Sequence, residues 1–216
     1  MIQQTVRRLS PLVPPMNTFI VTNVLHTELV ASQLPFLPKE NIISEPFGRN
    51  TAPCVGLAAL WIERIDPEGV MIVLPADHLI ADETAFRSVL EKAITVASES
   101  NALMTVGIQP NHPETGYGYI QFDDAEENNP YIEQDIFRVK TFAEKPNLET
   151  AERFLESGDF LWNSGMFIWK VGAILEEIKL HGLALPTGFD DRLLIERHIV
   201  LAERQLCEHK ATICGG

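Results

Sequence analysis

The sequence predicts an α/β protein with a mixed, mostly parallel sheet. Short apolar, β-rich runs alternate with helical stretches of about 10–15 residues, which is typical of a parallel sheet covered by helices on both faces. The run 70–74 is apolar without a break, as in a strand buried on both faces. The later, strand-rich part of the chain adds some antiparallel pairing. A chain of 216 residues can bury a core of this kind without disulfides or metals.

In the first part of the chain, strands are expected over 18–23, 41–44 and 69–74. A helix is expected over 26–33, followed by prolines that prevent its continuation. A second helix is expected over 51–65, where Thr51 is a suitable N-cap and Pro53 lies in the first turn. This second helix is apolar nearly all round, which predicts burial.

In the later part, Asp82 is expected to cap a helix, because apolar residues then recur at helical spacing: Phe86, Val89, Leu90, Ala93, Ile94 and Ala97. Further strands are expected over 103–107, 119–122, 138–143 and 161–170. Asn147 is expected to cap a helix that ends before Gly158, and the acidic stretch 123–134 is expected to be a surface loop.

Composition excludes several classes of protein. The formal net charge is −13 and no basic run appears, so the electrostatic footprint of a nucleic-acid-binding protein is missing. An anionic substrate would need a metal, a few placed cations or backbone N–H groups. Three cysteines favour a reducing compartment, and the longest apolar run is too short to cross a membrane. The chain is therefore expected to be soluble and cytoplasmic.

The carboxyl ends of the strands are where an open α/β sheet binds ligands. Asp77 follows the buried strand 70–74, where a carboxylate suits Mg²⁺ bridged to substrate phosphates; the alternative is a turn or capping residue. The segment 45–52 leads from a strand to a helix N-terminus, whose N–H groups can meet an anion. Arg49 within it could pair with a phosphate, unless the segment is an ordinary turn.

Three more strand ends carry candidate residues. Gly118 allows a tight turn or a close approach to a ligand, or else marks a bulge. Glu144 and Lys145 could accept a hydroxyl and bind a phosphate, or form a solvated pair, and Asn163 could meet a sugar hydroxyl or make a turn. Near the C-terminus, three potential metal ligands are too loosely spaced to indicate a metal site: Cys207, His209 and Cys214.

Taken together and in order, these segments resemble the mannose-1-phosphate guanylyltransferases of the bacterial type. The matching motifs are EPFGRNTAPCVGLAAL, LPADHLI, HPETGYGYI, FAEKP and WNSGMFIW, within a resemblance over about residues 1–179. The resemblance implies a Rossmann-like, three-layer α/β/α sugar-nucleotidyltransferase fold. It also implies transfer of a nucleotidyl group from GTP to mannose 1-phosphate with Mg²⁺, giving GDP-mannose and pyrophosphate.

The resemblance assigns roles residue by residue. Asp77 would be the Mg²⁺ ligand and, with Lys145, a catalytic residue. The guanine side would be lined by Arg49, Asn50, Thr51 and Ala52. Mannose and its phosphate would be held by Gly118, Glu144, Lys145 and Asn163.

The chain also departs from that family. The family opens with a strand and a loop of pattern GGxGTRLWPLS, whereas residues 1–5 resemble the helix that follows them, so a unit on the order of 30 residues is expected to be missing. Residues 1–180 are interpreted as a partial nucleotidyltransferase domain and 181–216 as an atypical tail. Asp190 and Asp191 match no motif for a second metal ligand, and a phosphomannose isomerase domain would not fit.

The leading hypothesis is a guanylyltransferase domain whose substrates are GTP and mannose 1-phosphate, with little activity in this chain alone. The alternatives are a related transferase for another sugar nucleotide, a non-catalytic sugar-phosphate-binding homologue, or a fragment that folds poorly. The sequence is compatible with a homo-oligomer but does not predict one.

Overall fold

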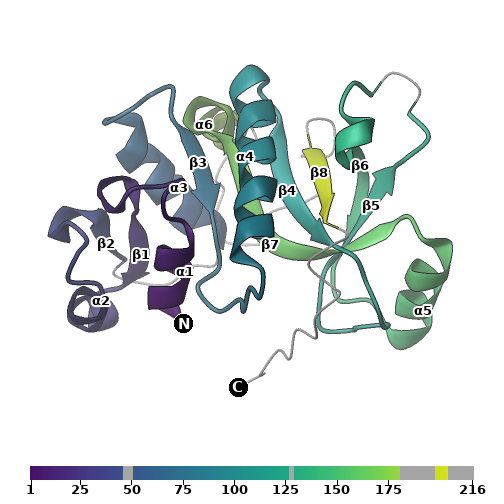
Figure 1. Cartoon of the computed structure of the whole chain (residues 1–216), viewed down its shortest axis with the longest axis horizontal. Helices are drawn as coiled ribbons and strands as arrows, with labels where there is room; N and C mark the ends of the chain where they lie inside the picture. The colour runs from purple at the N-terminus through teal and green to yellow at the C-terminus, as the bar shows by residue number, and fades with distance from the viewer. Residues whose placement is uncertain (46–50, 127–128, 181–197, 204–216) are drawn as a thin grey trace.

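The computed structural model describes residues 1–45, 51–126, 129–180 and 198–203 (Figure 1). The α-helices are α1 (Ile2–Arg8), α2 (Thr27–Gln33), α3 (Thr51–Glu63), α4 (Glu83–Glu99), α5 (Leu148–Ser157) and α6 (Val171–Leu180). The strands are β1 (Ile20–Asn23), β2 (Ile42–Glu45), β3 (Val70–Val73), β4 (Leu103–Ile108), β5 (Tyr119–Asp123), β6 (Ile136–Ala143), β7 (Phe160–Lys170) and β8 (His198–Glu203).

These strands form two sheets. β1 and β2 pair in parallel, and the other sheet has the order β3-β7-β4-β8-β6-β5, with β5 also paired to β7. The mixed α/β class is thus confirmed, but the expectation of a mostly parallel sheet is wrong among the described pairings. Among the described strands of the larger sheet, only β4 and β8 pair in parallel, and β3 pairs with β7 in the antiparallel direction. A continuous apolar run indicates burial on both faces, which does not fix the direction of a neighbouring strand.

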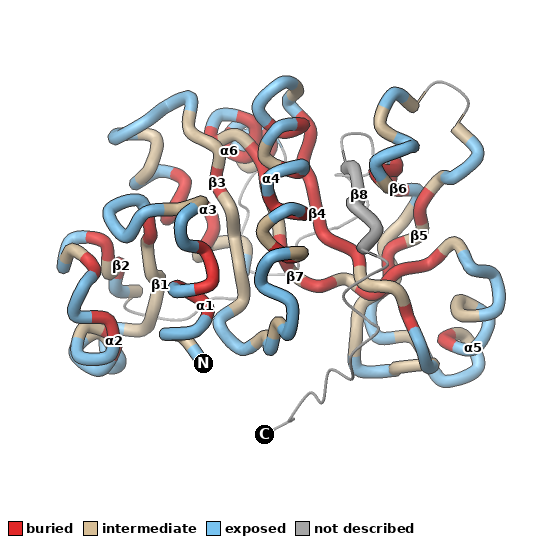
Figure 2. Tube along the Cα trace, in the orientation of Figure 1, coloured by how far each residue is buried: buried red, intermediate tan, exposed pale blue. Residues whose placement is uncertain are grey.

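Helices cover both faces of the larger sheet, as expected for three layers (Figure 1). Helix α4 packs on one face, where its apolar side meets Met104 and Val106 of β4 and Ile168 of β7. Helices α3 and α6 pack on the other face against Met71 of β3 and Trp169 of β7. The buried residues are concentrated along β4 and β7 (Figure 2), so β7 lies in the core of the molecule.

Most helix limits follow the sequence signals. The Asp82 side chain accepts hydrogen bonds from two N–H groups in the first turn of α4, and the Asn147 side chain caps α5 by accepting one from the Thr150 N–H. Gly158 ends α5 in the left-handed conformation, with φ of 78°. Thr51 is a correction, because it is the first helical residue of α3 rather than its N-cap. Helix ends commonly differ by a residue from the position of the capping signal.

Helix α3 is less buried than its composition predicted. Val55 and Ala59 face α6 and β3, whereas Leu57, Leu60 and Trp61 are exposed by 36%, 50% and 39%. Its buried apolar side chains are Val55, Ala58 and Ala59, so an apolar composition all round does not lead to burial all round.

Two findings concern the ends of the described region. Helix α6 and strand β8 were not expected from the sequence, and β8 lies between β4 and β6 although it belongs to the stretch interpreted as a tail. The boundary near residue 180 stays a prediction. Within the described residues, none of the helices combines the length and apolar character needed to cross a membrane.

Candidate functional site

Asp77 lies in the loop that follows β3, as expected. The loop 75–78 leaves the sheet at the end of β3, and Asp77 is exposed there while His78 is half-buried. Burial lowers the pKa of His78, although the neighbouring Asp77 carboxylate acts in the opposite direction. The loop therefore holds an imidazole whose charged form is disfavoured by burial, and it presents one carboxylate to solvent.

Helix α1 holds this loop through its backbone. The Thr5 hydroxyl donates to the carbonyl of Ala76 at 3.4 Å, and Nη2 of Arg8 donates to the carbonyl of His78 at 3.0 Å. Neither Thr5 nor Arg8 was a candidate from the sequence. The available signal is that Arg8 is a charged residue beside the apolar Val6 and Leu9 of a short helix, and it is buried with them.

Asp77 suits a metal ion only in combination with a ligand. In the part of the chain that the structure describes, no three His, Cys, Asp or Glu side chains gather in a way that could hold a metal. Mg²⁺ is usually bound by one or two carboxylates together with substrate phosphates and water. Asp77 therefore fits a Mg²⁺ ion shared with phosphates better than a cation held by protein ligands alone. The loosely spaced Cys207, His209 and Cys214 lie outside the described residues, as do Asp190 and Asp191.

The second group of candidates comes together where β5, β6 and β7 meet. The Asn163 N–H donates to the carbonyl of Gly118 at 2.8 Å. A Cβ atom on Gly118 would lie 3.0 Å from Oε2 of Glu144 and 3.5 Å from Cβ of Asn163. These residues are distant in sequence, so the strand pairings bring them together. A side chain at position 118 would therefore have to displace the Glu144 carboxylate, which lies at the end of a flexible, exposed side chain.

Lys145 completes this group. Its Nζ lies 3.8 Å from Oε1 of Glu144, and both side chains are about two-thirds exposed, so the ion pair is weak in water. Its backbone has a φ of 40°, in the left-handed region that non-glycine residues rarely adopt. Such conformations cost energy and gather at functional sites. An amide, a carboxylate and an ammonium in one place can bind the hydroxyls and the phosphate of a sugar phosphate.

Strand β7 joins the two groups. In its register with β3, Val73 lies opposite Phe167, so Pro75 comes alongside Gly165 just past the end of β3. A Cβ on Gly165 would lie 3.5 Å from Cγ of Pro75, and the N–H of Gly165 is bonded to Oδ1 of Asn163 at 2.9 Å. Gly165 has a φ of 68°. Gly165, where the pairing of β7 with β4 is irregular, therefore lies beside the Asp77 loop and is hydrogen-bonded to the Asn163 side chain.

The start of helix α3 lies near the same end of the sheet. Helix α3 packs against β3 and leads into it through a short connection, so its first turn is at the end of β3 where Asp77 lies. Thr51 is exposed and Ala52 is half-buried in that turn. Burial raises the pKa of Cys54, and the Glu45 carboxylate at the end of β2 adds to the effect. Arg49 and Asn50 lie outside the described residues.

An aromatic cluster supports the Gly118 segment. The rings of His112 and Tyr117 meet Trp162 edge-on, with centroids 4.8 and 5.4 Å away. The Glu114 carboxylate accepts a hydrogen bond from the Gly116 N–H at 2.7 Å. This bond is the main reason that the pKa of Glu114 is lowered. None of these residues was predicted as a site residue, and their role is to fix the backbone that carries Gly118.

Comparisons with known proteins agree with this geometry. The Nucleotidyl transferase family matches residues 1–185. The chain is 48% identical over 185 residues to the mannose-1-phosphate guanylyltransferase of Escherichia coli (strain K12), covering 83% of this chain and 37% of that protein. It is 46% identical over 183 residues to the mannose-1-phosphate guanylyltransferase ManC of Salmonella typhimurium, with the same coverage of 83% and 37%.

A solved structure is similar in fold as well. It is described as a mannose-1-phosphate geranyltransferase from Thermus thermophilus, with a TM-score of 0.76 and 28% identity over 93% of this chain and 63% of that one. The three-layer fold expected from the sequence is thus confirmed. The chain spans about 37% of the length of the curated relatives it matches.

Proposed function

Because the chain belongs to the nucleotidyl transferase family, we propose that it forms part of a mannose-1-phosphate guanylyltransferase. This enzyme would transfer the guanylyl group of GTP to mannose 1-phosphate, giving GDP-mannose and pyrophosphate. We place it in the cytoplasm, in keeping with its cysteine content.

The sugar-phosphate half of the proposal rests on the group formed by Gly118, Glu144, Lys145 and Asn163. Glu144 would accept hydrogen bonds from sugar hydroxyls, and Asn163 would donate to them. The Lys145 ammonium, which is exposed, would bind the phosphate of the sugar as a point charge. The bond between the Asn163 N–H and the Gly118 carbonyl is the observation that carries this assignment, because it joins two sequence motifs in one site.

The nucleotide half rests on Asp77 and on the start of α3. Asp77 would be a ligand of Mg²⁺, which when bound would neutralise charge on the triphosphate. Thr51 and Ala52 would line the guanine through the first turn of α3, and we extend this role to Arg49 and Asn50. The link from Gly165 to Pro75 supports a single site in which both substrates meet.

The reaction would be a displacement at phosphorus. A phosphate oxygen of mannose 1-phosphate attacks the α-phosphorus of GTP, a new P–O bond forms, and the bond to the bridging oxygen of the β-phosphate breaks. Pyrophosphate leaves with that electron pair. The chain's own residues position the two phosphates and offset their charge, and these contributions dominate in phosphoryl transfer. Lys145 would be placed to stabilise the attacking phosphate.

Titration calorimetry and a nucleotide panel test this function. The chain should bind mannose 1-phosphate saturably, and Asn163→Ala should weaken that binding by about tenfold, as expected for a lost hydrogen bond to a polar ligand. The affinity for GTP should be higher than the affinities for ATP, CTP and UTP when each is supplied with Mg²⁺ and mannose 1-phosphate.

Each of the other outcomes has a definite meaning. Preference for another nucleotide would indicate a related transferase. A chain that binds mannose 1-phosphate but binds none of the nucleotides would indicate a sugar-phosphate-binding homologue. A chain that melts cooperatively and binds neither substrate would contradict the proposal.

A further inference from the structure

Helix α1 contacts the backbone on both sides of Asp77. Thr5 bonds to the carbonyl of the residue before Asp77, and Arg8 bonds to the carbonyl of the residue after it. Thr5 and Arg8 are three positions apart in the helix, so they lie on the same face. The two contacts bracket the one residue of the loop that is proposed to bind metal, and neither contact uses its carboxylate.

Arg8 is an unusual residue to find in this place, because its side chain is only 3% exposed. A buried charge is costly unless it is hydrogen-bonded. Its Nε donates to the carbonyl of Gln4 at 3.3 Å, and its Nη2 is the group that reaches the loop. Burial lowers the pKa of Arg8, and the Glu83 carboxylate partly offsets this effect.

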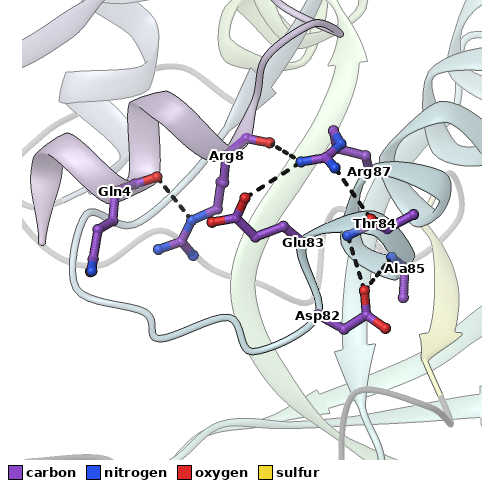
Figure 3. A network of polar contacts seen from close by, with 7 residues as sticks. All are labelled: Gln4, Arg8, Asp82, Glu83, Thr84, Ala85 and Arg87. Atoms are coloured by element: carbon purple, nitrogen blue, oxygen red, sulfur yellow. Dashed lines mark hydrogen bonds and ion pairs between the residues drawn. The ribbon is translucent and has the colours of Figure 1, made fainter.

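The surrounding network fixes Arg8 from the other side (Figure 3). Nη1 of Arg87 donates to the carbonyl of Arg8 at 2.9 Å and lies 3.6 Å from the carboxylate of Glu83. Asp82 caps the same end of α4 by accepting from Thr84 and Ala85. The end of α1 is thus tied to the first turns of α4, a helix that belongs to the core.

We propose that Arg8, assisted by Thr5, is a positioning residue for the Asp77 carboxylate. By holding the carbonyls of Ala76 and His78, α1 fixes the loop and leaves the Asp77 side chain exposed for a metal shared with a nucleotide. This inference rests on the proposed function, since it assigns a role in metal binding to residues that do not touch the metal. Such supporting contacts typically change metal affinity by about 10–100-fold.

The alternative is that Arg8 only packs α1 onto the protein, and a matched pair of variants separates the two roles. Arg8→Gln removes the charge and the contact with His78. Arg7→Gln removes the same charge from the preceding residue of the helix, which is exposed and for which no contact with the loop is found. Arg8→Lys keeps the charge and restores part of the donor capacity, and Thr5→Val removes the hydroxyl that bonds to the carbonyls of Ala76 and Met1.

The probe is Mn²⁺ with GTP, measured by electron paramagnetic resonance, and mannose 1-phosphate is titrated separately in the presence of EDTA. We expect Arg8→Gln to weaken the binding of Mn²⁺ with GTP by about tenfold and to leave the affinity for mannose 1-phosphate unchanged. The affinities of Arg8→Lys and Thr5→Val for Mn²⁺ with GTP should lie between those of Arg8→Gln and the wild type, and the affinity of Arg7→Gln should equal that of the wild type. Amide exchange over residues 75–80 should rise in Arg8→Gln and not in Arg7→Gln.

Equal behaviour of Arg8→Gln and Arg7→Gln in both measurements would overturn the inference. So would an equal loss of both affinities in Arg8→Gln, because that result indicates a general packing role. If Arg8→Gln does not fold, Arg8→Lys and Thr5→Val decide between the two roles by the same criterion. If the wild type binds no Mn²⁺ with GTP, the proposed function fails, and amide exchange over 75–80 still decides whether Arg8 holds the loop.

Discussion

The two halves of the site are built in different ways. The sugar-phosphate half is set by strand pairing, since the register of β7 against β4 and β5 fixes where Asn163 and Gly118 meet. The half that contains Asp77 is a loop, and side chains of α1 hold its backbone. Sheet registers tolerate little movement, whereas a loop depends on a few contacts. Ligand binding in the sugar-phosphate half should therefore be lost mainly through steric clashes. In the half that contains Asp77, it should be lost through the removal of single hydrogen bonds.

The largest effect is expected from filling the space at Gly118. In Gly118→Val the added atoms would press on Oε2 of Glu144 and Cβ of Asn163, which lie 3.0 and 3.5 Å from the Cβ position. If both groups lose their hydrogen bonds to the ligand, the cost is on the order of 100-fold in affinity. Calorimetry should therefore show a loss of this size in affinity for mannose 1-phosphate.

The control is Gly172→Val in α6, where nothing lies within 4 Å of an added Cβ. This variant should retain the wild-type affinity. Wild-type affinity in Gly118→Val as well would show that the sugar-phosphate half does not depend on close packing at Gly118.

Lys145 separates binding from backbone strain. Lys145→Ala and Lys145→Gly both remove the ammonium and should weaken mannose 1-phosphate binding by about tenfold, as for a lost bond to a charged group. Because the φ of 40° suits glycine, Lys145→Gly should be more stable to urea than Lys145→Ala by about 1 kcal/mol. Equal stability of the two variants would argue against a left-handed backbone at this residue.

Gly165 tests the link between the two halves, and Gly158 is its natural control. Both glycines have positive φ, so an alanine at either position should lower the free energy of unfolding by about 1 kcal/mol. Only Gly165→Ala places a Cβ beside Pro75, while nothing surrounds the Cβ position of Gly158. Gly165→Ala should therefore reduce the affinities for both mannose 1-phosphate and Mn²⁺ with GTP, and Gly158→Ala should change neither. A change in only one affinity would mean that the halves respond independently.

The smallest effect concerns pH. The lowered pKa of Glu114 means that its carboxylate stabilises the fold above its unfolded pKa of about 4.3, and that this stability is lost as the pH falls through the folded pKa. The difference in melting temperature between wild type and Glu114→Gln should thus be present at pH 7 and disappear as the pH falls through the lowered pKa of Glu114. Glu133→Gln, at an exposed position, controls for the loss of one charge. A difference that persists in acid would assign the effect to packing.

The sequence predicted the local features of this molecule better than its contacts. Asp82 and Asn147 mark the starts of α4 and α5 because caps are encoded within a few residues. The antiparallel pairing of β3 could not be predicted, because an apolar run reports burial and not strand direction. β8 lies in a stretch without a recognisable motif.

The candidate site shows the same division. Gly118, Glu144 and Asn163 were predicted from motifs, and the structure places them together. Their functional roles stay predictions. Arg8 was not predicted, because its importance comes from a loop about 70 residues further along the chain, and a single charged residue in a short helix carries no periodic signal.

The position of Gly165 in β7 also constrains how this protein can diverge. Gly165 is hydrogen-bonded to the side chain of Asn163, and a side chain added to it would meet Pro75 in the loop of Asp77, so a substitution there would alter the environment of both substrates at once. A substitution at Gly165 that changed the preference for the sugar would also change the binding of the nucleotide. Substitutions that change specificity should therefore accumulate at positions such as Glu144 and Thr51, each of which belongs to only one half of the site. Gly165 should be retained.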